Sequence, residues 1–206
     1  MMDASHLAAF LLPVIAISMI PGPDTLYVLN RSISQGRRAG LAAALGSANG
    51  VFGHITLSVV GFSALLMASR LGFLIVKVAG AAYLVYLGIR LLLKAAHVSG
   101  EHKLPHDPLS KVWLQGVLTN ILNPKVAVFF LAFIPQFIDS HRGHISMQFL
   151  TLGVIFDAIG TSWLCFVALA AGHLSRWFAT HPSAVTLQSR LTGLIFLMFA
   201  AKLALT

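Results

Sequence analysis

Six apolar segments follow one another along this 206-residue chain, and each is long enough to cross a lipid bilayer. A helix of about 20 residues spans the roughly 30 Å hydrocarbon layer at a rise of 1.5 Å per residue. The segments lie at residues 7–30, 41–68, 71–93, 112–138, 147–172 and 187–205. Of all residues, 57% are hydrophobic and only 10% are charged. The stretches between the apolar segments are too short to form a soluble domain. The sequence therefore predicts an all-α membrane protein in which residues 1–206 form one integral domain.

A polar loop at about residues 94–111 divides the expected helices into two sets of three, at about residues 1–96 and 107–206. The loop contains the helix breakers Pro105 and Pro108. Because three is an odd number, a second half that repeats the first has to enter the membrane from the opposite side. Such inverted repeats are typical of secondary transporters. We therefore expect six transmembrane helices arranged as an inverted repeat.

Two proline motifs break the first and fourth apolar segments at equivalent depths. Their residues are Pro21, Gly22, Pro23 and Asp24 in the first, and Asn123, Pro124 and Lys125 in the second. A proline inside a helix costs about 3 kcal/mol, and a charge near the bilayer centre costs about 2.5 to 3.5 kcal/mol. Backbone groups left unpaired at this depth have to face protein, water or a ligand. We therefore interpret Pro21, Gly22, Pro23 and Pro124 as hinges beside a transport site.

The charges at the two breaks suit a zwitterion. A half-helix that begins after Pro23 presents free N–H groups to a carboxylate, while the carbonyl groups before the break suit an ammonium group or a proton carrier. Asp24 is expected to attract an α-ammonium group. Lys125 is expected to attract the carboxylate, with Asn123 capping the second half-helix. The alternative is that the prolines only kink a tight bundle and that Asp24 and Lys125 neutralise each other.

Asp157 lies about ten residues into the fifth apolar segment, near the expected midplane. Its side chain is too short to reach the membrane surface. Because burial favours the neutral form of a carboxyl group, Asp157 is predicted to carry a proton against the substrate, together with Asp24. Static pairing with Lys125 is the alternative.

Two asparagines are further candidates for the substrate pathway, namely Asn49 and Asn120. Asn49 lies in a run of small residues that includes Gly46 and Gly50, whose spacing favours close packing against another helix. That helix belongs either to the same chain or to a second copy in a homodimer. Asn49 and Asn120 are therefore expected either to line the pathway or to link neighbouring helices.

The loop charges predict the orientation of the chain. Lys and Arg gather on the cytoplasmic side of membrane proteins. Nine of these residues border the loops of one face and three border the loops of the other. The nine include Arg31 and Lys111, which flank the first and central loops. Both termini are therefore expected outside, and the loop at 94–111 in the cytoplasm.

Several other classes of protein are disfavoured. The net charge of +8 is spread over short loops rather than a basic folded surface, so no nucleic-acid partner is expected. Cys165 is the only cysteine, and the loop histidines His97, His102 and His106 have no dense carboxylate partners, so no metal site or cofactor is expected. No GxSxG, HExxH or GxxxxGK[ST] motif is present, which disfavours an enzyme or an ATP-driven pump. A metal-ion exporter and a non-transporting structural or regulatory membrane protein are the alternatives.

Five short segments of the sequence carry a resemblance to a known family. They are IPGPDTL at 20–26, AGAAYL at 79–84, YLG at 86–88, LTNILNPK at 118–125 and FIPQFI at 133–138. With these segments the chain resembles the LysE/RhtB amino-acid exporters of bacterial inner membranes, in particular the neutral branch that exports homoserine, threonine and leucine. The resemblance implies a six-helix exporter driven by the proton gradient. It leaves open the amino acid, the coupling stoichiometry and the oligomeric state.

Overall fold

The computed structural model describes an all-helical chain. The residues outside the description are 1–3, 69, 94–105, 140–142, 182, 184–185, 188–189, 192, 195–196, 199 and 202–206. The helices are α1 (Ala4–Met19), α2 (Pro23–Gln35), α3 (Arg37–Ala68), α4 (Arg70–Leu93), α5 (Leu109–Ile121), α6 (Pro124–Val128), η1 (Phe129–Phe133), η2 (Ile134–Phe137) and α7 (Ile145–Thr180). No strand occurs among the described residues, as the sequence predicts.

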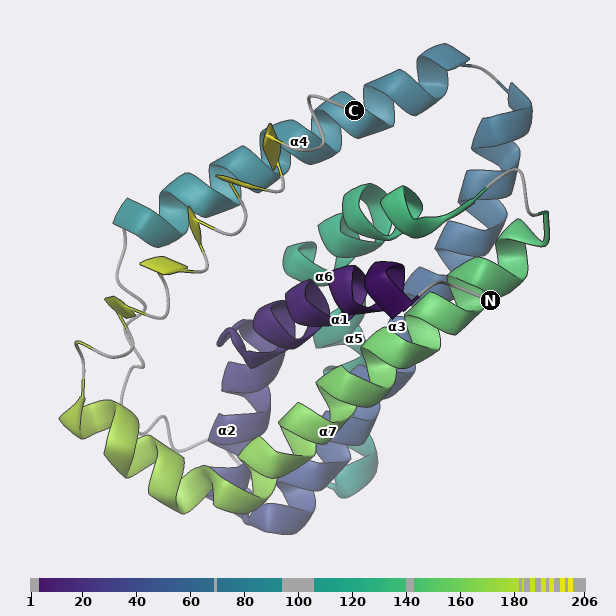
Figure 1. Ribbon diagram of the computed structural model, residues 1–206. Helices are drawn as coiled ribbons and strands as arrows, with labels where there is room; N and C mark the ends of the chain where they lie inside the picture. Colours follow the sequence, from purple (N-terminus) through teal and green to yellow (C-terminus); the bar gives the residue numbers. More distant parts are fainter. Residues whose placement is uncertain are drawn as a thin grey trace.

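Both proline motifs end one helix and begin another. The axes of α1 and α2 differ by 46°, and the axis changes by 45° between α5 and the stretch Pro124–Phe137. Pro23 and Pro124 each occupy the first turn of the new helix, where the missing N–H is not needed. Figure 1 shows the first of these bends, where α1 turns into α2. The prolines therefore place two pairs of half-helices inside the fold.

In the described part of the chain, two helices are long and apolar enough to cross a membrane, at Arg37–Gly61 in α3 and at Ile145–His173 in α7. The described residues give up to four spans if each bent pair is counted as one. The third expected segment forms α4, and among the described residues it contributes the shorter apolar stretch Ala81–Arg90. The sixth expected segment, at 187–205, lies partly outside the described residues, and the polar loop lies mostly outside them. The full set of six spans and the inverted repeat stay predictions.

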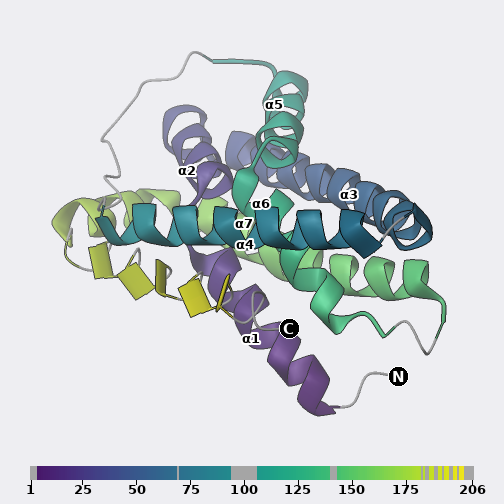
Figure 2. The same cartoon turned by 90° about the horizontal axis from the view of Figure 1, so that it is seen from above.

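The small residues of α3 lie against α5 of the same chain. A Cβ atom added at Gly46 would lie only 2.1 Å from the backbone oxygen of Trp113, and one at Gly116 would lie 2.5 Å from that of Ala43. Gly50 meets the side chain of Asn120 in the same way, at 2.6 Å. Figure 2 shows α5 crossing α3. The glycine stripe is therefore occupied by an intrachain contact, which is one of the two alternatives that the sequence leaves open.

A second close approach brings the C-terminal segment against α4. An added Cβ at Gly193 would lie 2.6 Å from the backbone oxygen of Gly88. In Figure 1 the described pieces of the chain after residue 182, drawn in yellow, accordingly follow α4. Glycine pairs thus set two of the helix contacts, because only glycine lets two backbones come so close.

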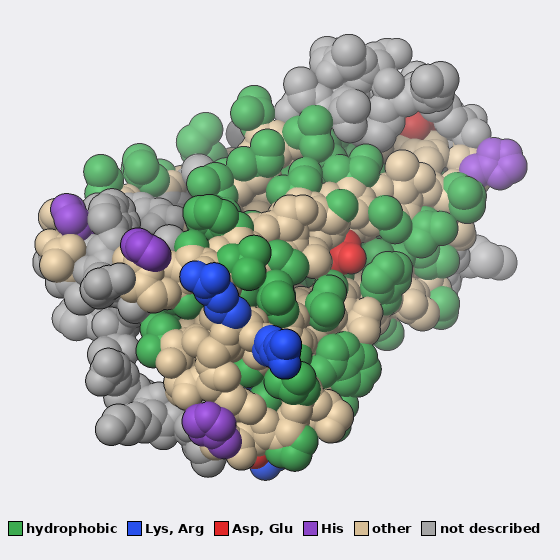
Figure 3. Space-filling model, turned by 90° about the horizontal axis from the view of Figure 1, so that it is seen from below, with side chains coloured by type: hydrophobic (Ala, Val, Ile, Leu, Met, Phe, Trp, Pro, Cys, Tyr) green, Lys and Arg blue, Asp and Glu red, His purple; other side chains and the backbone are tan. Residues whose placement is uncertain are grey.

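The core consists of two apolar clusters. One is aromatic and joins α1 to η1 and α7 through Phe10, Phe129 and Phe156. The other joins α2, α3 and α7 through residues such as Val28 and Ala168. Large apolar side chains also cover much of the outside, and Figure 3 shows a face that is largely hydrophobic with few charged side chains. Such a surface fits a lipid environment rather than water.

Candidate functional site at the helix breaks

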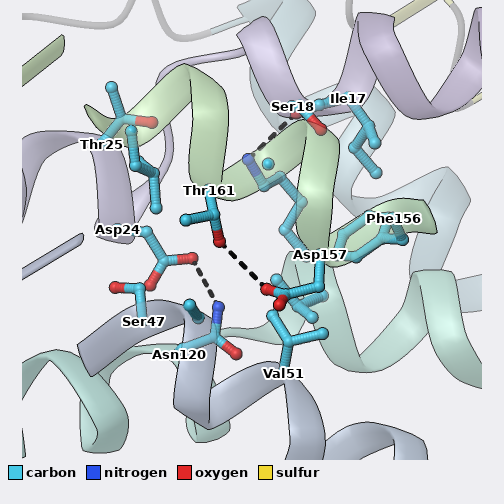
Figure 4. A pocket seen from close by; sticks show the side chains of 15 residues that line it. Ile17, Ser18, Asp24, Thr25, Ser47, Val51, Asn120, Phe156, Asp157 and Thr161 are labelled. Carbon is cyan, nitrogen blue, oxygen red and sulfur yellow. Dashed lines mark hydrogen bonds between the residues drawn. The ribbon is translucent and has the colours of Figure 1, made fainter. Parts of the chain in front are cut away.

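A small polar cavity lies between the two helix breaks. Its volume is about 40 Å³, which is several times the roughly 10 to 15 Å³ that one water molecule needs. The polar residues that line it are Ser18, Asp24, Thr25, Ser47, Asn120, Lys125, Asp157 and Thr161. They come from α1, α2, α3, α5, α6 and α7, so the cavity is a meeting point of both halves (Figure 4).

Asp24 is held by the second half of the chain. It lies in the first turn of α2, where the helix dipole favours a negative charge. One carboxylate oxygen, Oδ2, accepts hydrogen bonds from the Asn123 side-chain amide at 2.6 Å and from the Asn120 side-chain amide at 3.1 Å. His54 in turn contacts the backbone oxygen of Asn120 at 3.1 Å. The carboxylate is therefore fixed from outside its own helix.

Lys125 binds the end of α1. Its ammonium group donates to the backbone oxygens of Ile17 at 3.1 Å and of Ile20 at 3.2 Å. These carbonyl groups lie at the negative end of the α1 dipole and have no partner in the following helix turn. The backbone N–H of Lys125 donates to the Asn123 side-chain oxygen at 3.0 Å, so Asn123 caps α6 as the sequence predicts. The carbonyl groups before the first break therefore do receive an ammonium group, but it belongs to the protein.

Asp157 lies across the cavity on α7. Its Oδ1 atom accepts a hydrogen bond from the hydroxyl of Thr161, one helix turn later, at 3.1 Å. Within the described part of the chain, no ion pair joins Asp24, Lys125 or Asp157 to one another. Among these residues Lys125 therefore makes no direct contact with either carboxylate, but Asp24 and Lys125 line the same cavity, so the neutralisation of their charges that the sequence left open stays a prediction.

Four buried oxygen atoms at this cavity have no hydrogen-bond partner among the described residues. They are Ser18 Oγ, Asp24 Oδ1, Ser47 Oγ and Asn120 Oδ1. Each unmet buried polar atom costs about 1 to 3 kcal/mol, and native proteins contain few of them. Four on residues that line a single cavity mark it as a candidate site for a ligand or for bound water. The Asp24 and Asn120 oxygens accept hydrogen bonds, whereas the serine hydroxyls accept or donate them.

The structure brings most of the candidate residues together. Asp24, Asn120, Lys125 and Asp157 line the cavity, and Asn123 supports it through Asp24 and Lys125. Asn49 does not join them, because its side chain is exposed on another face of α3. The hinge residues lie at the break itself: Gly22 is buried beneath Lys125, whose ammonium nitrogen would lie 3.1 Å from an added Cβ atom.

Sequence reasoning missed the hydroxyl groups of the site. Ser18, Ser47 and Thr161 line the cavity but are common residues inside apolar helices. One signal was available for Thr161, which lies four residues after Asp157 and therefore on the same helix face. For Ser47 the sequence offers no such signal. The nearby Asn49 is more polar and is therefore the residue that the sequence favours as a candidate.

A second polar cluster, outside the cavity, links the end of α2 to the start of α5. Arg31 forms an ion pair with Asp107 at 2.7 Å and also donates to the Gln115 side chain at 2.7 Å. The hydroxyl of Tyr27 donates to the backbone oxygen of Val112 at 2.9 Å. Hydrogen bonds from Lys111 and then from Arg31 hold the pKa of Asp107 below its usual value. Arg31 is 3% exposed while Lys111 is exposed, so this cluster is a partly buried connection between the two halves.

Known proteins resemble this chain over nearly its whole length. A family profile described as LysE type translocator matches residues 15–206. The leucine efflux protein of Salmonella typhimurium is 30% identical over 196 residues, covering 95% of this chain and 92% of that protein. An uncharacterized membrane protein of Vibrio cholerae is 35% identical over 199 residues, covering 95% of each chain. No solved structure matches the chain.

Proposed function

Since the chain belongs to the LysE type translocator family, we propose that it exports neutral amino acids such as leucine, threonine or homoserine in exchange for protons. At the level of the family it is a multi-pass membrane transporter and not an enzyme. The membrane is the bacterial inner membrane, with both termini on the periplasmic side. The six helices form an inverted repeat.

The observation that carries this proposal is the set of four buried oxygen atoms without partners around the cavity. An α-ammonium group has three N–H donors. It would donate to Asp24 Oδ1, Asn120 Oδ1 and Ser47 Oγ, which come from three different helices. A charged donor also balances the Asp24 carboxylate, which lacks an ion pair within the described residues.

The carboxylate of the substrate would lie near Lys125 and Ser18. The Lys125 ammonium group has three N–H donors, and the backbone oxygens of Ile17 and Ile20 use two of them. The third is left for a carboxylate, and the hydroxyl of Ser18, which lines the same cavity, is a second donor. An amino acid would thus bridge the two helix breaks and bind the oxygen atoms that have no partner among the described residues.

Proton coupling is assigned to Asp157, with Asp24 as its partner across the cavity. The site contains two carboxyl groups and one ammonium group, so one negative charge is in excess. A proton on Asp157 removes this excess when the substrate has left. Because Asp157 is held only by Thr161 among the described residues, it is able to gain and lose a proton without breaking an ion pair.

Alternating access follows from movement about the two breaks. The cavity of about 40 Å³ is too small for a whole amino acid, since ligand sites commonly measure roughly 300 to 1,000 Å³. The halves therefore have to move apart to admit the substrate. On the side of α2 and α5 that we assign to the cytoplasm, the Arg31–Asp107 contact would have to open.

The test is transport by the pure protein in proteoliposomes. Labelled leucine is supplied under an imposed pH gradient, and unlabelled leucine, threonine, homoserine and lysine compete with it. We expect competition by the neutral amino acids and little by lysine. If no amino acid is transported or competes, the substrate assignment is wrong. A protein that carries no flux at all would instead be the structural or regulatory alternative.

A matched pair of asparagine variants tests the place of the site. Asn120→Ala removes a buried amide that lines the cavity and binds Asp24. Asn49→Ala makes the same chemical change at an exposed position on α3. We expect Asn120→Ala to weaken leucine competition and Asn49→Ala to leave it unchanged. Equal effects of the two variants would place the substrate elsewhere.

A further inference from the structure

An apolar groove lies beside the polar cavity, between α1 and α7. It is lined by Ile15 and Met19 of α1 and by Ile159, Trp163 and Phe166 of α7. Its volume is about 360 Å³, and the groove is largely open on its outer side. Ile15, Met19 and Phe166 are exposed on its outer side, so the groove is open to the lipid and closed by the two helices on its inner side.

Ser18 belongs to both the groove and the cavity. On α7 the two spaces use neighbouring faces of one helix, because Ile159 and Trp163 line the groove while Gly160 and Leu164 line the cavity. Gly160 of α7 faces Ser18 of α1 where the two spaces approach each other. Of the described atoms, only Ser18 Oγ would lie within 4 Å of a Cβ atom added at Gly160, at 3.8 Å.

The two spaces differ in the chemistry that they offer. The cavity contains charged and hydroxyl groups, as Figure 4 shows for Asp24, Asp157 and Ser18, but measures only about 40 Å³. It has room for the head of an amino acid and none for a side chain of four carbons. The groove has that room, and its lining is apolar apart from two serines.

We propose that this groove receives the side chain of the substrate while the cavity holds its ammonium and carboxylate groups. The inference rests on the proposed function and adds the substrate class, which is amino acids with apolar side chains of the size of valine, leucine or phenylalanine. A side chain in the groove leaves water and contacts the groove residues and lipid, both of which are apolar. Lysine is rejected because its charge would lie at the lipid.

The first experiment is a side-chain series in proteoliposomes. Glycine, alanine, valine, leucine and phenylalanine compete with labelled leucine for transport by the full-length protein. A hydrophobic subsite discriminates roughly tenfold or more for each added carbon group that it buries. We therefore expect leucine to compete at least roughly tenfold better than alanine, and glycine to be the weakest competitor.

The second experiment fills the groove. Ile15→Trp adds a large ring to its wall, and Leu12→Trp makes a comparable change on α1 at a lipid-facing position, 71% exposed, that lines neither space. We expect Ile15→Trp to weaken leucine competition roughly tenfold while alanine still competes as in the wild type. Leu12→Trp should leave the whole series unchanged.

The outcomes separate this inference from the proposed function. If the wild type carries amino acids but glycine, alanine and leucine compete equally, the groove is not the side-chain subsite although the protein is an exporter. If Ile15→Trp lowers alanine and leucine competition equally, or acts no differently from Leu12→Trp, the groove is filled by a lipid chain and the inference is wrong. If no amino acid is carried, the proposed function itself fails.

Discussion

Asp24 presents one carboxylate oxygen to the protein and one to the cavity. Oδ2 is fixed by two asparagine amides, while Oδ1 is buried without a partner. This division matters because a ligand can bind Oδ1 without disturbing the contacts that hold the side chain. A carboxylate that binds a charged donor contributes about 1.5 to 3 kcal/mol, which makes Asp24 the strongest single group of the proposed site.

Asp24→Asn tests this role with a side chain of the same shape. The amide oxygen can still accept from Asn120 or Asn123, so the fold should persist, but the negative charge is lost. We expect substrate affinity to fall by roughly 10-fold to 100-fold, measured as the concentration of leucine that half-saturates transport in proteoliposomes. An unchanged affinity, with the protein folded, would remove Asp24 from the binding site.

Gly22 leaves room for the Lys125 ammonium group. An added Cβ atom would lie 3.1 Å from Lys125 Nζ and 3.3 Å from Cε. The backbone of Gly22, with φ of −123° and ψ of −173°, suits any residue, so the expected effect of Gly22→Ala comes from displacing Lys125. We expect a several-fold slower transport with normal expression and thermal stability.

Gly53→Ala is the matched control for that variant. Its added Cβ atom would only reach Ile121 at 3.5 Å, which is an ordinary contact. Gly53→Ala should therefore transport at the wild-type rate. A Gly22→Ala protein that is as active as Gly53→Ala would show that the position of Lys125 does not limit transport.

At the scale of helices, the contact between α3 and α5 depends on the absence of side chains. Gly46→Ala would place a methyl group 2.1 Å from the backbone oxygen of Trp113, and a backbone atom cannot rotate away as a side chain does. Overpacking of this kind costs typically about 1 to 3 kcal/mol and sometimes more. We expect a clear fall in the thermal unfolding temperature in detergent.

The control lies on the same helix. Gly61→Ala is expected to be neutral or slightly stabilising, because no described atom lies within 4 Å of the added one and alanine has the higher helix propensity. If Gly46→Ala and Gly61→Ala unfold at the same temperature, the close crossing of α3 and α5 is absent in the membrane protein.

The stability that the contacts of Asp107 between α2 and α5 provide should depend on pH. Lys111 and Arg31 lower the pKa of Asp107 in the folded chain. A carboxyl group with a lowered pKa stabilises the fold above its unfolded value, which is near 3.9, and loses this contribution as the pH falls through the folded value. Asp107→Asn should therefore be less stable than the wild type at pH 6, and the difference should shrink at pH 3. Thermal unfolding of both proteins at the two pH values measures this difference in stability. A difference that is the same at pH 6 and pH 3 would contradict the role of the charge.

The positions of the helix breaks follow from the sequence because they depend on local chemistry. Pro23 and Pro124 lack an N–H group wherever they lie in a fold, and Asn123 caps the helix that begins directly after it. The partner of Lys125 does not follow from the sequence. It depends on the end of α1 coming within reach of α6, 105 positions apart along the chain for Ile20, and nothing in the local pattern encodes that distance.

The choice between Ser47 and Asn49 shows the same limit within one helix. Two positions apart, the side chains point to nearly opposite sides of α3, since each residue turns the helix by about 100°. The sequence favoured the more polar residue, Asn49, but the crossing of α5 at Gly46 and Gly50 turns Ser47 towards the cavity. Helix packing, rather than the polarity of the side chain, therefore decides which of these two residues lines the cavity.

At the scale of the whole molecule, the proposal requires that proton movement and substrate movement be one process. Asp157 faces Asp24 and Lys125 across a cavity built from both halves, so its charge is felt by residues that have to separate when the site opens. Energetic coupling between two ligands of this kind commonly amounts to about 1 to 3 kcal/mol, or roughly 5-fold to 150-fold in affinity. Removing the titrating group should remove the coupling while leaving the substrate site in place.

Asp157→Asn is therefore expected to abolish net export driven by a pH gradient while exchange of labelled for unlabelled leucine continues. Exchange needs the halves to move with substrate bound, whereas net export also needs the empty carrier to return with its proton. Thr161→Val removes the hydroxyl that holds Asp157 but keeps its charge, so this variant should shift the pH dependence of export without abolishing it. Both fluxes are measured in the same proteoliposomes, with and without the gradient. If Asp157→Asn exports at the wild-type rate with an unchanged pH dependence, the proton is carried by another group, and Asp24 is then the remaining carboxyl group at the cavity.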